Sequence, residues 1–420
     1  MNTDILKSQM QDFTKPFAFA PDFVMPDYET FNVRNILPQV WGLFSGKEIG
    51  SHDFRNGYLD EHEGVEKVVL VIFDGLGYNR LLSHLTGHEG FFENLVENGV
   101  LNPLTTVFPS TTSSVLTSIF TGLAPSQHLI LGYHMFSKKY GLVYDTLDMK
   151  PVYGYNGQVE LARDYSRNLK PLLPYFEQNG IKTLVATKAS IAESGLSQIT
   201  HPDQKLIPYL LSSDMLVRSK QALERQGRTL LVVYYSGVDT LAHRYGPYSE
   251  EVTFELRSIE RNLKAFAGEL SEQTRKKTLL VLTADHGVAE TRKTYFTKDY
   301  PELDNMLRLP PVGDSRACFL FVRPNLIDSF PGVFEKTIRG FELFSSMDLI
   351  EKGAFGPLSD VADLKEKVGD FCAIANGPTG LAYPFYEEDR GRLLLGTHGG
   401  MTAEEMVVPF LSVRLSKIQQ

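Results

Sequence analysis

The sequence predicts an α/β fold with a mostly parallel central sheet, helices on both faces and a small cap insertion. Short apolar runs rich in β-branched residues alternate with segments whose apolar residues recur at helical spacing. A strand that is apolar along its whole length is buried on both faces, as in a parallel sheet covered by helices. The runs cover residues 68–73, 182–187, 229–235, 278–284 and 318–322.

Composition divides the chain into three parts. Residues 1–60 are rich in Pro, Phe and Asp, contain one helix candidate at 31–44, and are expected to form an arm that packs on the core. Residues 61–289 and 398–420 should form the α/β core. Residues 290–397 are expected to be partly core and partly a small cap over the ligand-binding edge of the sheet.

Charge and cysteine content exclude several classes of protein. The chain has 42 Lys and Arg against 51 Asp and Glu, a formal net charge of −9, so a nucleic acid polymer is not an expected partner. The two cysteines, Cys318 and Cys372, are interpreted as buried thiols. The first thirty residues show no apolar stretch behind a basic start, so we expect no membrane partner and a cytoplasmic location.

Three of the apolar runs end in loops that carry Asp or His. Asp74 follows the run at 68–73 directly. Asp239 and His243 follow the run at 229–235, and their spacing of four places both on one face of a helical turn. Asp285 and His286 follow the run at 278–284. Ligands of open α/β sheets bind beyond the carboxyl ends of the strands, so these side chains are expected to converge there.

Together with His398, which lies among glycines near the C-terminus, these residues supply three Asp and three His. Singly, a strand-terminal Asp is often a cap or turn residue, and a lone His is more often structural than a ligand. Jointly, the mixed oxygen and nitrogen donors suit two divalent ions, with zinc favoured and manganese or cobalt as alternatives.

A hydroxyl-rich segment precedes a predicted helix that ends at Gly122. The backbone N–H groups at a helix N-terminus are directed at any anion bound there. Taken alone, Ser110, Thr111 or Thr112 would be interpreted as a helix cap. A neighbouring metal pair makes one of these hydroxyls a candidate nucleophile.

Taken in order, the segments VIFDGLG, STTSS followed by TG, GVDTLAH, TADHG and THGG resemble the alkaline phosphatase superfamily, particularly its nucleotide pyrophosphatase/phosphodiesterase (type I phosphodiesterase) branch. The resemblance spans roughly residues 65–412. It implies a two-metal hydrolase that cleaves a phosphodiester or pyrophosphate bond in a small phosphate ester through a covalent phosphothreonine. The family nucleophile lies nine positions before the Thr of the TG pair, here Thr121, which indicates Thr112, with Thr111 as the runner-up.

The resemblance also implies the ligand sets. One metal ion would be held by Asp74, Asp285, His286 and Thr112, and the other by Asp239, His243 and His398. Coordination would favour the alkoxide of Thr112 for attack on phosphorus. Tyr133 stands where the branch commonly has an Asn that contacts a phosphoryl oxygen, and its hydroxyl could donate a comparable hydrogen bond.

Charge arithmetic favours a diester substrate. Three carboxylates and the Thr112 alkoxide contribute −4 and two divalent ions +4, so a singly charged diester suits the site better than a doubly charged monoester. No Lys or Arg lies between Leu101 and Phe136 to match a second charge. A cation from elsewhere, such as Arg244 or Arg316, would alter this expectation.

Several alternatives stay open at this stage. A phosphomonoesterase, a phosphonoacetate-type hydrolase and a phosphomutase of the same superfamily use related sites, although the TG-type helix favours a hydrolase over a mutase. The non-enzyme alternative is a catalytically silent binding protein, which the presence of every expected ligand disfavours. In the cap, Tyr295, Phe296 or Tyr300 could stack on a base or sugar, although packing the cap is the more frequent role of such residues.

Overall fold

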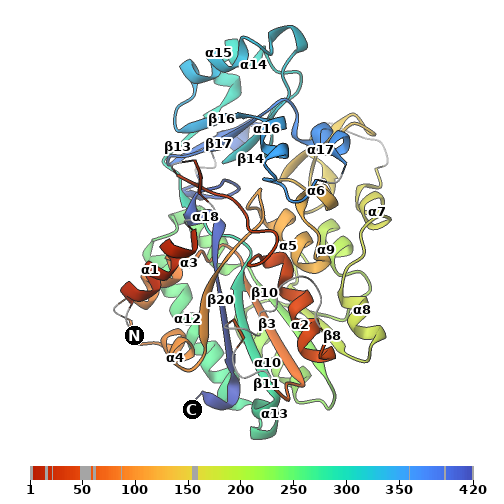
Figure 1. The fold of residues 1–420 in the computed structure, drawn as a ribbon, viewed down its shortest axis with the longest axis vertical. Coiled ribbons are helices and arrows are strands. Elements are labelled where there is room, and N and C mark those ends of the chain that lie inside the picture. Colours follow the sequence, from red (N-terminus) through yellow and green to blue (C-terminus); the bar gives the residue numbers. More distant parts are fainter. Residues whose placement is uncertain are drawn as a thin grey trace.

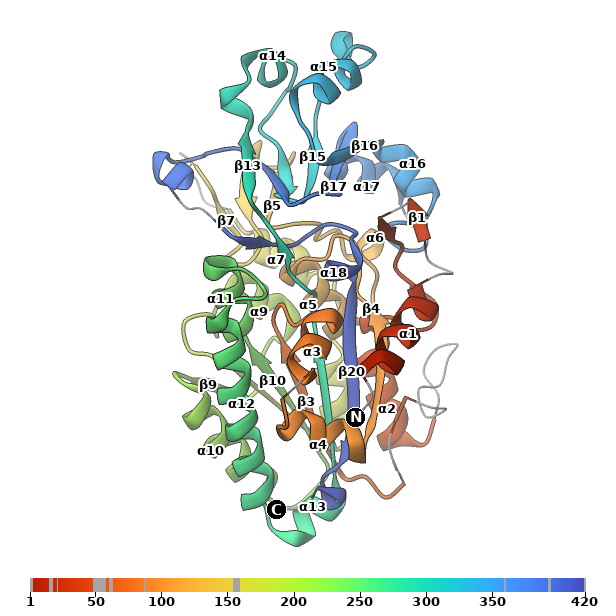
Figure 2. The same cartoon turned by 90° about the vertical axis from the view of Figure 1, so that its left-hand side faces the viewer.

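In this computed structural model the described residues are 3–14, 18–20, 22–47, 58–59, 63–86, 88–153, 159–358, 360–391 and 394–418. An α/β core occupies one end of the long axis, and a smaller layer built on a second sheet occupies the other (Figure 1). Helices α10 (Ser212–Leu223) and α12 (Glu250–Glu269) lie on one side of the central sheet and α2 (Ile36–Ser45) on the other (Figure 2). The predicted α/β class is confirmed.

The central sheet has the strand order β4-β20-β11-β3-β10-β8-β9. Five neighbouring strands are parallel, whereas β20 is antiparallel to both β11 and β4. Strands β3, β10 and β11 are buried along their whole length, as their uninterrupted apolar runs predict. The strands are β3 (Lys67–Phe73), β4 (Val100–Thr105), β8 (Lys182–Lys188), β9 (Leu206–Tyr209), β10 (Thr229–Tyr235), β11 (Thr278–Ala284) and β20 (Val407–Arg414).

The apolar run expected at 318–322 forms strand β15 (Ala317–Leu320), but it belongs to the second sheet. A short apolar run does not encode which sheet it joins, so its assignment to the parallel sheet was wrong. The second sheet has the order β16-β17-β15-β14-β5-β6-β7, with antiparallel pairs. Its other strands are β5 (His134–Ser137), β6 (Leu142–Asp145), β7 (Lys150–Pro151), β14 (Val312–Asp314), β16 (Phe341–Ser345) and β17 (Phe371–Ala375).

The second sheet therefore combines strands from two separate parts of the chain. Strands β14 to β17 come from residues 290–397, the segment expected to contribute a cap. Strands β5 to β7 come from residues 134–151, which the sequence analysis assigned to the core. Through the pairing of β14 with β5, the segment that follows the hydroxyl-rich helix lies beside the later insertion in one sheet.

The N-terminal segment packs against the core. The helix expected at 31–44 is the 3-10 turn η2 (Val33–Asn35) followed by α2, which ends at Gly46 in the left-handed conformation with φ 68°. Ile36, Leu37 and Val40 of α2 are buried in the main hydrophobic core. Within the part of the chain that the structure describes, no helix is both long and apolar enough to cross a bilayer.

Candidate metal-dependent active site

The side chains expected to bind metal converge at the carboxyl edge of the central sheet. Asp74 follows β3, while Asp285 and His286 follow the adjacent strand β11. Helix α11 (Gly237–Tyr245) begins just after β10, the other neighbour of β3, and carries Asp239 and His243. His398 follows the short strand β19 (Gly396–Thr397). The ends of β10 and β11, the two neighbours of β3, thus bring Asp239 and Asp285 close to Asp74, which lies more than 160 positions earlier in the chain.

One group of possible ligands contains Asp74, Asp239 and His286, whose donor atoms all lie within 4.8 Å of one another. Nε2 of His286 is 3.6 Å from Oδ1 of Asp74 and 3.6 Å from Oδ2 of Asp285. The other oxygen of Asp285 accepts hydrogen bonds from the backbone N–H groups of Gly75 at 3.1 Å and His286 at 2.8 Å. These bonds fix the Asp285 carboxylate and leave its second oxygen directed at the group.

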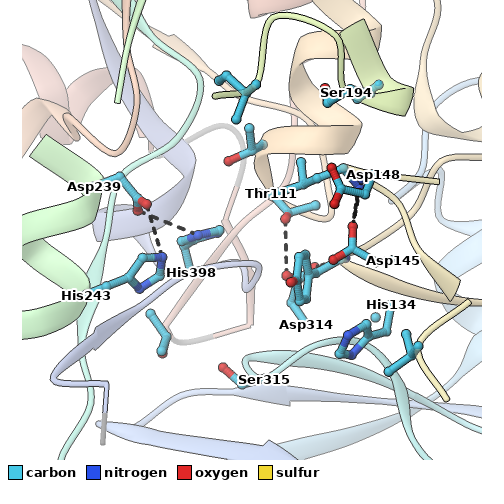
Figure 3. Close-up of a pocket in the computed structure, with 18 of the residues that line it drawn as sticks. Thr111, His134, Asp145, Asp148, Ser194, Asp239, His243, Asp314, Ser315 and His398 are labelled. Atoms are coloured by element: carbon cyan, nitrogen blue, oxygen red, sulfur yellow. Dashed lines mark hydrogen bonds and ion pairs between the residues drawn. The ribbon is translucent and has the colours of Figure 1, made fainter. Parts of the chain in front are cut away.

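The second group contains Asp239, His243 and His398 (Figure 3). Nε2 of His243 lies 3.1 Å from Oδ2 of Asp239, and Nε2 of His398 lies 3.7 Å from Oδ1. Asp239 belongs to both groups, whereas the sequence analysis gave it to one ion. The structure thus places its carboxylate between the two groups.

The three histidines all have their Nδ1 atoms within hydrogen-bond distance of a backbone carbonyl. The partners are Gly396 for His243 at 2.7 Å, Ser110 for His398 at 3.2 Å and Gly287 for His286 at 3.1 Å. A ring that donates from Nδ1 carries its lone pair on Nε2, the atom that faces the carboxylates here. This orientation by a backbone carbonyl is typical of histidines that bind metal ions.

Three buried carboxylate oxygens in the site have no hydrogen-bond donor among the described residues: Oδ1 of Asp74, Oδ1 of Asp239 and Oδ2 of Asp285. Burial, together with repulsion from the other two carboxylates, raises the pKa of Asp74 well above its usual value, and burial also raises the pKa of Asp285. A buried carboxylate oxygen that lacks a donor is costly, so this donor set fits divalent cations.

The charged form of the His243 imidazole is favoured, whereas the charged forms of Asp74 and Asp285 are disfavoured. Burial disfavours its charged form, but the Asp239 carboxylate outweighs that effect and raises the pKa of His243 to about 9. For His398, burial and the neighbouring His286 ring lower the pKa. The two rings of His286 and His398 stack with centroids 3.7 Å apart. Titratable groups that lie close together in a cleft and have pKa values shifted in opposite directions are typical of functional sites.

The predicted nucleophile helix is α5 (Thr112–Thr121), and it ends at Gly122 with φ 73°, as expected. The hydroxyl oxygen of Thr112 lies 3.1 Å from Nε2 of His286, so it faces the first group of ligands. The hydroxyl of Thr111 instead donates to Oδ1 of Asp314 at 3.1 Å, and that of Ser110 donates to the Gly400 carbonyl at 2.8 Å. Thr112 is therefore the hydroxyl in this segment that is placed next to the candidate ligands.

A cavity of about 1140 Å³ opens onto these groups, between the two sheets. Tyr133 lines it and keeps 40% of its surface exposed. Of the three cap aromatics named from the sequence, Phe296 lines the cavity, whereas Tyr295 and Tyr300 pack in the hydrophobic cluster of the outer layer. Further aromatic lining residues that the sequence did not single out include His134, Tyr383, Phe385 and Tyr386.

Sequence analysis missed Asp314, at the end of β14. Its carboxylate accepts hydrogen bonds from the Thr111 hydroxyl and, at 3.2 Å, from the backbone N–H of Tyr133. Burial raises the pKa of Asp314 to about 7. The preceding segment LPPVG reads as an ordinary loop, and only the pairing of β14 with β5 brings this residue beside α5. Figure 3 shows Asp314 across the cavity from Asp239.

Neither of the two arginines considered from the sequence, Arg244 and Arg316, lines the cavity. Arg316 is fully buried and makes a bidentate ion pair with Glu405, at 2.7 Å and 3.0 Å. Arg244 is not among the residues that line the cavity. Neither guanidinium is thus positioned to match a second charge on a phosphoryl group.

A mostly parallel sheet with Asp and His residues at its carboxyl edge is the arrangement expected of the alkaline phosphatase superfamily. Its sequence matches the type I phosphodiesterase/nucleotide pyrophosphatase family over residues 68–325, so the chain belongs to that family. The fold supports the membership. The expectation drawn from the ordered motifs is confirmed.

Similar folds occur in several solved structures. Human ectonucleotide pyrophosphatase/phosphodiesterase 5 superposes with a TM-score of 0.63 at 18% identity, covering 83% of this chain and 87% of the other. The murine protein gives 0.62 at 18% identity over 83% and 88%, and an inactive variant of it was solved with AMP. Phosphonoacetate hydrolase from Sinorhizobium meliloti 1021, in complex with phosphonoformate, gives 0.61 at 17% identity over 82% and 89%.

Proposed function

We propose that this chain is a two-metal hydrolase that cleaves a phosphodiester or pyrophosphate bond in a small substrate, through a phosphothreonine formed on Thr112. The observation that supports this most strongly is the set of buried carboxylate oxygens of Asp74, Asp239 and Asp285 that lack donors. They share one edge of the sheet with three histidine Nε2 atoms and the Thr112 hydroxyl. Divalent ions, with zinc favoured, would supply the positive charge that these groups lack.

Each ligand has a part in this proposal. Asp74, Asp285, His286 and Thr112 would hold one ion and Asp239, His243 and His398 the other, with the Asp239 carboxylate between them. When bound, such ions stabilise the deprotonated form of a coordinated hydroxyl and the charge on a departing oxygen. Residues beyond these ligands position the substrate.

Thr112 then acts as the nucleophile. Its oxygen attacks phosphorus in line, a new O–P bond forms, and the bond to the leaving oxygen breaks. Backbone N–H groups of the first turn of α5 point toward the phosphoryl oxygens. Water later cleaves the Thr112 phosphoester and restores the free hydroxyl. The phenol of Tyr133, which lines the same cavity, would be a further donor to that group.

The charge of the cavity supports a diester over a monoester. Besides the expected metal ligands, the lining includes five carboxylates and two lysines, a formal sum of −3. One of the lysines, Lys150, lies 3.6 Å from the Asp148 carboxylate. The net negative charge of the lining thus opposes a second negative charge on the substrate. The five carboxylates belong to Asp145, Asp148, Asp314, Glu388 and Asp389, and the lysines are Lys150 and Lys188.

A substrate panel tests the proposal. The purified chain, supplied with Zn²⁺ or Mn²⁺, should hydrolyse bis-aryl phosphates and dinucleotides, and Thr112→Ala should lose this activity while keeping its metal. Turnover of phosphonoacetate, but not of diesters, would instead support the phosphonoacetate-type alternative. Absence of both activity and bound metal after supplementation would support a silent binding protein.

A further inference from the structure

A second set of metal-binding side chains lies outside the cavity. His84 is in the last turn of α3 (Tyr78–Leu85), His88 follows four residues later, and Glu260 is on α12. The Nε2 atoms of His84 and His88 lie 2.9 Å and 3.0 Å from the same oxygen, Oε2 of Glu260. None of the three residues lines the large cavity.

The distances suit one small divalent ion. The three donor atoms all lie within 4.8 Å of one another. In a tetrahedral zinc site with bonds of about 2.0–2.1 Å, neighbouring ligand atoms are about 3.3 Å apart. The observed separations of 2.9 Å and 3.0 Å are slightly shorter. The ion would therefore fit after a shift of a few tenths of an ångström. Rotation of the partly exposed His88 side chain can supply that shift.

The charge of Glu260 points the same way. Its side chain is 4% exposed, and no Lys or Arg of the described residues forms an ion pair with it. Its oxygens accept a hydrogen bond from the Phe92 N–H and lie within hydrogen-bond distance of the His84 and His88 rings. A buried carboxylate calls for a positive charge close by.

The residues around Glu260 fix its carboxylate and leave the His88 side open to an ion. The backbone N–H of Phe92 donates to Oε1 of Glu260 at 2.8 Å, which leaves Oε2 to face the histidines. The His88 side chain is 27% exposed, whereas that of His84 is 1% exposed, so an ion can enter from the His88 side. Nδ1 of His84 is buried without a hydrogen-bond partner among the described residues, so this ring lacks the outer support usual at tight sites.

We propose that His84, His88 and Glu260 form a third metal site, for one Zn²⁺-type ion completed by water, separate from the catalytic pair. The missing outer hydrogen bond makes it weaker than the catalytic sites. The ion would tie α3, which follows the Asp74 loop, to α12, which follows the helix carrying Asp239 and His243. Its role is thus to stabilise the framework behind the active site rather than to take part in the reaction.

The test compares the full-length chain with His88→Ala and His88→Asn, because Asn keeps a donor toward Glu260 but removes the imidazole. Glu89→Gln is the matched control, since Glu89 is the exposed neighbour in the same loop. Zn²⁺ bound per chain is measured by mass spectrometry after equilibrium dialysis at increasing Zn²⁺. The melting temperature is followed over the same range, because an ion that binds only the folded chain raises it.

We expect both His88 variants to bind one ion fewer than the wild type and to lose the part of the Zn²⁺-dependent rise in melting temperature that appears at the highest concentrations. Their diesterase turnover should stay within about twofold of the wild type, because the site is remote from the reaction. Glu89→Gln should match the wild type. Equal metal content and equal melting shifts in all four proteins would overturn the third site and leave a hydrogen-bonded link between α3 and α12.

Discussion

Replacing Asp314 with Asn should relax the discrimination against doubly charged phosphomonoesters. Asp314 is half-buried, accepts a hydrogen bond from Thr111 beside the proposed nucleophile, and has a pKa raised to about 7 by desolvation. Its carboxylate is therefore partly ionised at neutral pH, and cations bound nearby would increase that fraction. Asn keeps the size of the side chain and removes the charge.

The magnitude follows from Coulomb's law. At an effective dielectric constant of about 20, any two unit charges of like sign about 7 Å apart repel by about 2.4 kcal/mol. Half-ionisation of Asp314 reduces this to about 1.2 kcal/mol, or about sevenfold in kcat/KM. For the wild type, the neutral metal and alkoxide arrangement predicts a preference for the diester of at least tenfold, about 1.4 kcal/mol. Asp314→Asn should thus lower that preference by about sevenfold.

The assay measures kcat/KM for bis-aryl and mono-aryl phosphates that share one leaving group, each divided by its uncatalysed rate. Asp148→Asn is the control, because Asp148 also lines the cavity but is 55% exposed and lies close to Lys150. Its charge is screened by solvent, so the ratio should hardly change. An unchanged ratio in Asp314→Asn, or an equal change in Asp148→Asn, would refute the electrostatic reasoning. A corrected preference of the wild type for the monoester would refute the diesterase assignment itself.

Three further predictions concern the nucleophile, the metal ligands and the core. Thr112→Ala should lower kcat by at least about 10²-fold with metal content unchanged, and full activity here with loss in Thr111→Ala would move the nucleophile by one residue. His243→Ala and Asp285→Ala should each lower the bound metal measured by mass spectrometry as well as the rate, and unchanged stoichiometry in both would remove them from the ligand set. Arg316→Ala should cost about 3–5 kcal/mol of unfolding free energy in denaturant titration, since it leaves the buried carboxylate of Glu405 unpaired. By contrast, a loss below about 1 kcal/mol would show that water replaces the ion pair.

The sequence alone predicted four strands of the central sheet, β3, β8, β10 and β11, and the residues that gather at its edge. Apolar runs of about seven residues specify strands buried on both faces, so β3, β10 and β11 could be placed almost to the residue. The chemistry-bearing residues follow these strands directly, and parallel strands end at a common edge. Local pattern and one topological rule were therefore enough to bring Asp74, Asp239 and Asp285 into one site.

Tertiary structure decided everything that depends on pairing between distant segments. Nothing in the run at 317–320 says that it pairs antiparallel with β17 in the outer sheet instead of joining the core. Asp314 becomes an active-site neighbour through the pairing of β14 with β5, and Glu260 meets His84 only because α12 packs near α4 (Phe91–Asn98) and the end of α3. Periodicity and spacing report a residue's own strand or helix, whereas these contacts arise from long-range packing, for which a single sequence carries no local signal.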